Sequence, residues 1–151
     1  MALNPEFAGR VYPPSAPYVV GREKIREFAD AVGDPNPAFH DVEAARALGY
    51  RDLIAPPTFA IIMTTKASRV VIFDPELGLD FARVVHGEQR FSYVRPIVAG
   101  DELVVTTSIE SIRSRAGNDM IATRADVATV DGEAVASTMS LLISRGPDEV
   151  S

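Results

Sequence analysis

The sequence has no cysteine and only two histidines among its 151 residues. The lack of cysteine excludes disulfides, thiolate-bound metals, iron–sulfur clusters and a cysteine nucleophile. With His40 and His86 as the only imidazoles, one chain cannot build a three-histidine zinc site. We therefore expect no metal centre.

Lysine and basic clusters are scarce as well. Lys24 and Lys66 are the only lysines, no basic run occurs, and the net charge is −6. Nucleic-acid phosphates require a basic surface, so a nucleic-acid partner is not expected. The longest wholly apolar run, 59–63, is far shorter than the roughly 20 residues of a membrane span. The first residues lack the charged-then-apolar order of a signal peptide. We expect a cytoplasmic protein with no membrane partner.

The common signatures of cofactor and hydrolytic sites are also missing. The chain contains no GxGxxG, no GxxxxGKS/T, no GxSxG and no HExxH. The sequence therefore lacks the main motif of each of four enzyme classes, namely Rossmann dehydrogenases, P-loop enzymes, elbow-type serine hydrolases and zincins. No cofactor is expected.

What is present divides into a helical first half and a strand-rich second half, and the length favours one domain over 1–151. Apolar residues at helical spacing predict a helix over 22–32 that ends at Gly33. A second, short helix should follow Asp41, which is a good N-cap. The apolar segment 58–72 predicts a helix surrounded by protein, with a buried strand as the alternative.

From residue 83 the hydrophobic period changes to two, which is typical of strands. Strands are predicted near 83–94, 102–114, 119–130 and 134–144. Turn residues predict three consecutive hairpins, at Ala99-Gly100-Asp101, Ala116-Gly117-Asn118 and, as a type I′ turn, Asp131-Gly132.

The last predicted strand has an apolar face, marked by Val135, Met139, Leu141 and Ile143. A sheet with one apolar face must be covered, and the helix over 58–72 is the obvious cover. The predicted fold class is therefore α+β, with an antiparallel sheet wrapped around a central helix, which is the hot-dog arrangement.

The loop over 34–40, Asp-Pro-Asn-Pro-Ala-Phe-His, carries a carboxylate, an amide and an imidazole. Asp34 and His40 could together hold a water molecule and move its protons. The same residues are good turn formers, so Asp34 could equally cap a helix end. His86, inside a strand, is interpreted as structural or interfacial.

This loop resembles the D-x-N-P-x-H signature of MaoC-like (R)-specific enoyl-thioester hydratases and dehydratases. Residues 54–59 resemble the entry to that family's central helix, and 89–91 with 96–101 resemble its Q-x-x-F…P-V-x-x-G-D stretch. The similarity runs from about residue 10 to 145. It is strongest to the actinobacterial (3R)-hydroxyacyl-carrier-protein dehydratase subunits, of the FAS1-like dehydratase type. Within that branch the chain resembles the subunit that accompanies a catalytic one.

The resemblance implies a lyase that hydrates enoyl thioesters, or dehydrates 3-hydroxyacyl thioesters, carried on coenzyme A or acyl carrier protein. It makes Asp34 and His40 the catalytic pair that holds the water. It makes Asn36, Pro57 and Thr58 substrate-binding residues, because a backbone N–H at the start of the central helix binds the thioester oxygen. The family has a glycine near Pro57, and proline has no N–H. The donor is therefore expected to be the N–H or the hydroxyl of Thr58, whose alternative role is to cap the helix.

Two residues, Ala38 and Phe39, stand before His40 where the family has one. The first interpretation is an enzyme whose loop absorbs the extra residue. The second is a catalytically weak thioester-binding subunit that pairs with a catalytic hot-dog subunit. A hot-dog thioesterase is a weaker third, because 58–72 contains no Asp or Glu. A homodimer, or a heterodimer with a related hot-dog subunit, is expected because the sheet edges need covering.

Overall fold

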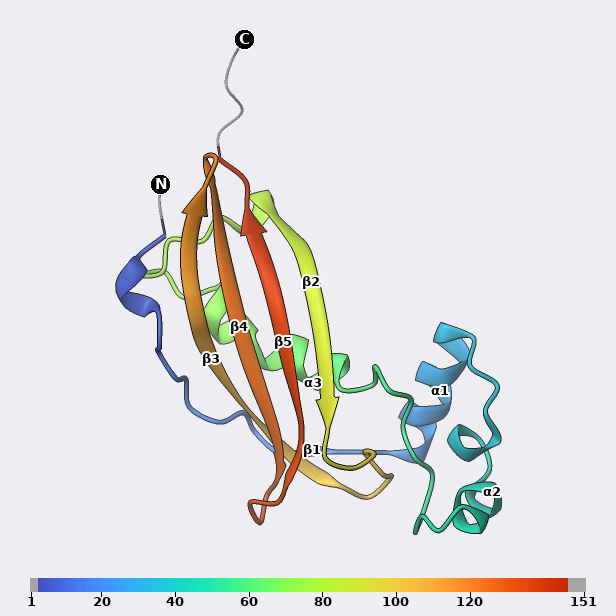
Figure 1. The fold of residues 1–151 in the computed structure, drawn as a ribbon. Helices are drawn as coiled ribbons and strands as arrows, with labels where there is room; N and C mark the ends of the chain where they lie inside the picture. The colour runs from blue at the N-terminus through green and yellow to red at the C-terminus, as the bar shows by residue number, and fades with distance from the viewer. Residues whose placement is uncertain (1–2, 147–151) are drawn as a thin grey trace.

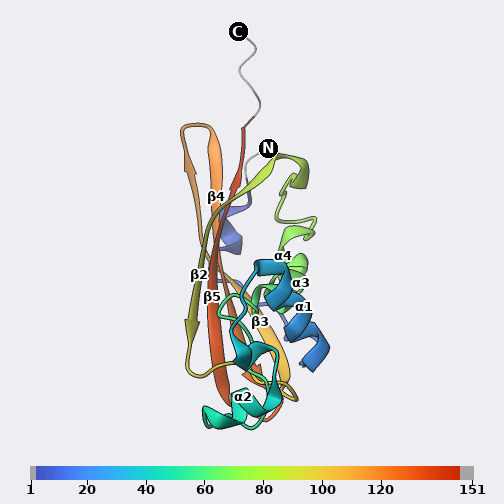
Figure 2. The same ribbon diagram turned by 90° about the vertical axis from the view of Figure 1, so that its right-hand side faces the viewer.

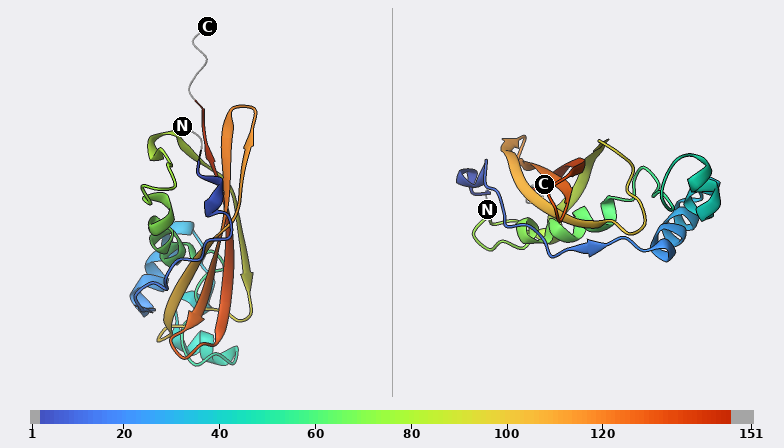
Figure 3. Two further views of the ribbon diagram at one scale, coloured as in Figure 1. Left: turned by 90° about the vertical axis from the view of Figure 1, so that its left-hand side faces the viewer. Right: turned by 90° about the horizontal axis from the view of Figure 1, so that it is seen from below.

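A computed structural model describes residues 3–146 and shows one curved antiparallel sheet, with the helices of the 58–72 segment against its concave face and the first two helices beside it (Figures 1 and 3). This confirms the predicted hot-dog fold class. The strands are β1 (Tyr18–Val19), β2 (Val84–Tyr93), β3 (Glu102–Arg115), β4 (Asn118–Thr129) and β5 (Ala134–Ser144). The α-helices are α1 (Arg22–Val32), α2 (Val42–Ala47), α3 (Ile61–Ala67) and α4 (Arg69–Ile72), and short 3-10 turns span Pro5–Phe7, Pro37–Phe39 and Phe81–Arg83.

The strand order is β1-β3-β4-β5-β2, so two of the three predicted hairpins are present. The third prediction, a hairpin at 99–101, is wrong, because β2 pairs with β5 and not with β3. The segment before β3 instead forms backbone hydrogen bonds with residues 53–55. The Ala99 N–H donates to the Leu53 carbonyl, and the Ala55 N–H donates to the Ile97 carbonyl. These bonds carry the chain across the end of the sheet.

The turn at Asp131-Gly132 closes a hairpin, but its predicted type is wrong. A type I′ turn needs positive φ at both central residues, and here only Gly132 has it, at 96°. The loop is longer than two residues, and the Thr129 N–H donates to the Glu133 carbonyl at 2.8 Å across it. The β3–β4 turn instead has two positive φ values, 48° at Ala116 and 76° at Gly117.

The face of β5 that packs against the helix is not the apolar face that the sequence pattern predicted to be covered. Thr138, Ser140 and Leu142 line the space beneath α3. Side chains alternate across a strand, so Met139, Leu141 and Ile143 lie on the outer face, where they are half-buried. Val135 is buried in the core, since it lies where the register between β4 and β5 shifts. The assignment of the covered face was therefore wrong for three of the four residues.

The segment predicted as the central helix is helical, as two short helices joined at Ser68. The Ser68 hydroxyl donates to the Thr64 carbonyl at 2.7 Å, a bond that competes with the regular helical ladder. The two prolines are followed by a tight turn, in which the Phe59 N–H donates to the Pro56 carbonyl at 2.9 Å. Phe59 and Ala60 are fully buried, so the start of this segment anchors the helix against the sheet.

The first two helices form a unit beside the start of α3 (Figure 2). Gly33 ends α1 with φ 72°, and the Asp41 side chain caps α2 by accepting from the Glu43 N–H, as predicted. Phe28 of α1 meets Phe59 edge-on, with 5.5 Å between the ring centroids. This contact holds the 34–40 loop close to the entry of the central helix. Within 3–146, no helix combines the length and apolar character needed to cross a membrane.

Candidate functional site

The polar side chains at the start of the 34–40 loop hold the loop's own backbone. The Asp34 carboxylate accepts from the Asn36 N–H at 3.1 Å. The Asn36 side-chain oxygen accepts from the Ala38 N–H at 3.1 Å and so caps the turn at Pro37–Phe39. One carboxylate oxygen of Asp34 and the side-chain amide of Asn36 therefore act as turn formers, which is the alternative role considered from the sequence.

His40 contacts Asp34 through the backbone. Its Nε2 lies 3.0 Å from the Asp34 carbonyl oxygen, and since a carbonyl only accepts, Nε2 carries the proton. Its Nδ1 lies 3.9 Å from a carboxylate oxygen of Asp30. The Arg26 side chain donates to the His40 carbonyl at 2.9 Å. The structure thus brings Asp34 and His40 together without an imidazole–carboxylate hydrogen bond between them.

A cavity of about 330 Å³, here called the loop cavity, lies between this loop and the entry to the central helix. Two of the predicted substrate-binding residues, Asn36 and Pro57, line it, whereas Asp34, His40 and Thr58 do not. Thr58 is exposed, and the N-cap of α3 is Ala60 with no side-chain cap, so Thr58 does not cap this helix. The full lining is Asn36, Phe39, Ile54, Ala55, Pro57, Tyr93, Val94, Arg95 and Pro96.

Tyr93 is a lining residue that the sequence did not indicate, because in a strand pattern it looks like any alternating aromatic. Its hydroxyl is buried and has no regular hydrogen-bond partner among residues 3–146. Burial raises the pKa of Tyr93, and the nearby Ala60 N–H lowers it only in part. The hydroxyl is therefore a neutral donor beside the start of α3.

Arg95, the second unpredicted residue, is held by the aspartate of the Gly100-Asp101 motif. The Asp101 side chain is only 3% exposed and accepts from Arg95 at 2.8 and 3.1 Å. It also accepts from Arg51 at 2.5 Å and from the Val98 N–H at 2.9 Å. Burial alone would raise the pKa of Asp101, but the hydrogen bonds from Arg95, Val98 and Arg51 outweigh it and hold the pKa below its usual value. This motif residue is a structural anchor for the wall of the loop cavity.

Replacing Asp101 with Asn is expected to lower the free energy of unfolding by about 2–4 kcal/mol, because it removes the charge of a buried carboxylate that accepts hydrogen bonds from Arg95 and Arg51. The folded-state pKa is depressed, so this stabilisation is present above the unfolded pKa of about 4 and is lost as pH falls through the folded value. Urea unfolding at neutral and acidic pH measures both effects. The difference in the free energy of unfolding between wild type and variant should become smaller in acid. The exposed turn aspartate offers a matched control, Asp131→Asn, expected within about 0.5 kcal/mol of wild type. Equal losses in both variants would contradict the anchoring role.

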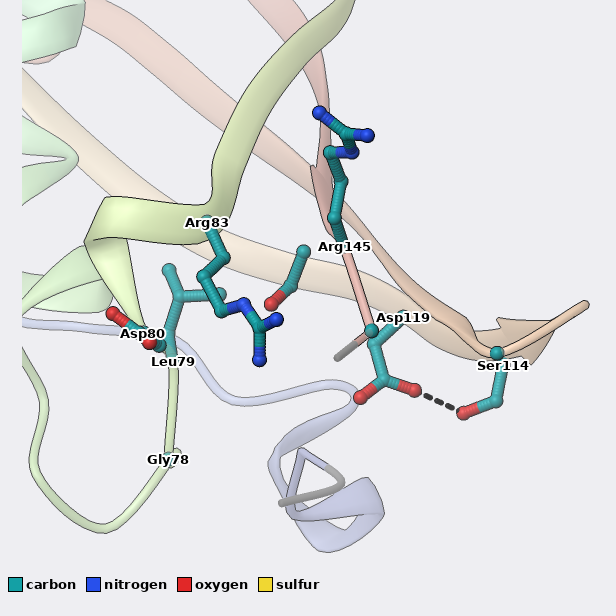
Figure 4. A pocket seen from close by; sticks show the side chains of 10 residues that line it. Gly78, Leu79, Asp80, Arg83, Ser114, Asp119 and Arg145 are labelled. Carbon is teal, nitrogen blue, oxygen red and sulfur yellow. Dashed lines mark hydrogen bonds between the residues drawn. The ribbon is translucent and has the colours of Figure 1, made fainter. Parts of the chain in front are cut away.

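A larger cavity, of about 640 Å³, lies at the other end of the sheet, beside the β3–β4 turn (Figure 4). The Arg83 guanidinium extends into it, while the Arg145 side chain turns away from Asp119. Asp119 accepts a hydrogen bond from the Ser114 hydroxyl. The lining thus carries two arginines and two aspartates, Asp80 and Asp119, so its charges balance. None of the predicted site residues lines this cavity. Within residues 3–146, no group of three His, Cys, Asp or Glu side chains is placed to hold a metal ion.

Comparison with known proteins places this geometry in context. The family described as "FAS1-like, dehydratase domain region" matches residues 6–138. A UPF0336 protein of Streptomyces avermitilis is 58% identical over 149 residues, 99% of each chain. A chain of the C-terminally truncated HadBC (3R-hydroxyacyl-ACP dehydratase) complex of Mycobacterium tuberculosis is 36% identical with a TM-score of 0.82, over 91% of this chain and 96% of that one. A MaoC-like dehydratase is 36% identical with a TM-score of 0.87, over 96% of this chain and 44% of that one.

Proposed function

Because the chain belongs to the FAS1-like dehydratase-domain family, as its motifs predicted, we propose that it serves the (R)-specific hydration of enoyl thioesters and the reverse dehydration of 3-hydroxyacyl thioesters. The carrier is coenzyme A or acyl carrier protein, the latter by analogy with the HadBC dehydratase. Within this reaction the chain binds the acyl thioester and pairs with a related hot-dog subunit that carries the catalytic residues.

This assignment rests on which side chain of the 34–40 loop contacts the loop cavity. Phe39, which is 5% exposed, lines the loop cavity, whereas His40 does not. A general acid or base must reach the reacting atoms within hydrogen-bond distance. The proton on Nε2 of His40 is already directed to the Asp34 carbonyl. A phenyl ring in contact with the cavity favours acyl binding over proton transfer.

The oxygen-binding end of the cavity supports the same assignment. Pro57 lines the cavity and has no N–H to donate to a thioester oxygen. The donor role proposed for Thr58 needs its backbone N–H to face the cavity, because the side chain is exposed outside it. A missing oxyanion donor costs about 10²–10³-fold in rate, which favours a partner that supplies a complete site.

Pairing with a second hot-dog subunit is supported by the edge of the sheet. The ten-residue strand β2 lies at one end of the strand order and, within residues 3–146, pairs only with β5. A long unpaired edge strand invites pairing with another chain. Exposed apolar side chains lie at and near this edge, namely Phe73, Phe81 and Val85. A related subunit, or a second copy, would cover both features.

The second candidate function is hydration by this chain itself, which the shared loop of Asp34 and His40 favours. Replacing Asp34 with Asn, or His40 with Ala, separates the two roles when crotonyl-CoA hydration is measured on the paired subunits. For a thioester-binding subunit, we expect the rate to stay at the wild-type value. A loss of about 10²-fold or more, the scale of a lost acid–base group, would instead assign catalysis to this loop.

A further inference from the structure

Between the central helix and the sheet lies a cavity of about 250 Å³, here called the hydroxyl cavity. It is lined from six elements, namely α3, α4, the 3-10 turn Phe81–Arg83, β2, β4 and β5, and by Ser68 between the two helices. Among residues 3–146, no Asp, Glu, Lys or Arg lines it, and the imidazole of His86 is part of the lining, so the cavity suits an uncharged polar ligand. Its uncharged polar lining includes Thr64, Ser68, Gln89, Thr123, Thr138 and Ser140.

Three of these threonines have hydroxyls without protein partners. Thr64, Thr123 and Thr138 are at most 4% exposed, and none of their hydroxyls makes a hydrogen bond within residues 3–146. The two serines differ: Ser68 donates to a helix carbonyl, and the Ser140 hydroxyl lies 3.2 Å from Nε2 of His86. These three hydroxyls border the cavity, and a hydroxyl removed from water needs a hydrogen-bond partner. A polar group of a ligand in the cavity can supply the partner that the protein does not.

The hydroxyl cavity lies farther along the same two elements as the loop cavity, and the two cavities share no lining residue. Tyr93 of β2 lines the loop cavity, and Gln89 lines the hydroxyl cavity. At the usual strand rise, these two residues lie about 13 Å apart. On the helical side, Pro57 lines the first cavity and Ile61, where α3 begins, lines the second. To reach the hydroxyl cavity, an acyl chain whose thioester sits in the loop cavity has to extend between β2 and α3.

We propose that the hydroxyl cavity selects acyl thioesters whose chain carries a hydroxyl or carbonyl group well beyond the reacting carbons. The hydroxyls of Thr64, Thr123 and Thr138 donate to, or accept from, that oxygen. This inference rests on the proposed function, because it takes the ligand to be an acyl thioester. A plain alkyl chain fits the same volume but displaces water from the three hydroxyls without replacing its hydrogen bonds, so the cavity discriminates against it.

The test is calorimetric titration of the full chain, alone and with its catalytic partner, with decenoyl-CoA and with its ω-hydroxy analogue. Because one hydrogen bond is worth up to about tenfold in affinity, we expect the ω-hydroxy chain to bind about 10-fold more tightly than the plain one. Thr123→Val and Thr138→Val keep the side-chain shape and remove the hydroxyl. Each is expected to reduce this preference several-fold and to melt at or above the wild-type temperature.

Thr107→Val is the matched control, because Thr107 is also a buried threonine with an unpaired hydroxyl but lies outside this cavity. It should leave the preference unchanged. Equal affinity for the two thioesters in the wild-type chain, or a preference that survives both cavity substitutions, overturns the inference and leaves the proposed function standing. If neither thioester binds the folded chain or its pair, the proposed function and this inference fail together.

Discussion

Pairing the chain with a catalytic hot-dog subunit is expected to raise its rate of crotonyl-CoA hydration by about 10³-fold or more. The isolated chain lacks an imidazole at the loop cavity, where Phe39 lies, and lacks an N–H at Pro57. A general acid or base contributes about 10²–10⁴-fold, and an oxyanion donor about 10²–10³-fold. A partner with the D-x-N-P-x-H loop and a glycine at the helix entry restores both groups.

Steady-state hydration by each subunit alone and by the mixture, with sedimentation to establish the species present, measures this effect. The catalytic subunit alone is the necessary control, since it has the complete residues but not this chain's acyl cavities. Its rate should rise on mixing most strongly for long acyl chains. A purified homodimer of this chain that already hydrates crotonyl-CoA at the full rate of the mixture would reject the division of roles.

The second large effect is expected from rebuilding the site within this chain. Deleting Phe39 and replacing Pro57 with Gly should raise hydration by the isolated chain by about 10²-fold or more, the scale of one restored catalytic group. The deletion moves His40 one residue closer to Asn36-Pro37 and removes the phenyl ring from the cavity. The glycine supplies a backbone N–H at the entry to the central helix.

Deleting Ala38 instead of Phe39 gives the same spacing but retains the phenyl ring, which makes it a matched control. We expect a smaller gain from it, because Phe39 still contacts the cavity. Thermal unfolding of every variant is needed, since Ala38 and Phe39 are both buried. A folded double variant with no gain in rate would show that the loop geometry, and not these two residues, limits the chemistry.

Features that depend on near neighbours were predictable from the sequence. Gly33 ends α1 because it tolerates the left-handed conformation, and Asp41 caps α2 because its carboxylate reaches an N–H two residues on. Hydrophobic periodicity located the helices and strands, and the order of motifs predicted the dehydratase family. The extra residue before His40 and the proline at the helix entry were visible as departures from that family's pattern.

Long-range pairing decided the rest. The residues at 99–101 look like a hairpin turn, yet β2 pairs with β5, because the backbone of 97–99 is bonded to 53–55. Period-two alternation shows that β5 has two faces but not which one meets the helix. Only the register of β4 and β5 placed Thr138 and Ser140 beneath α3. By itself, the sequence determined the elements and the family. The tertiary structure decided which polar groups share a cavity, because that depends on strand register and on backbone bonds between distant segments.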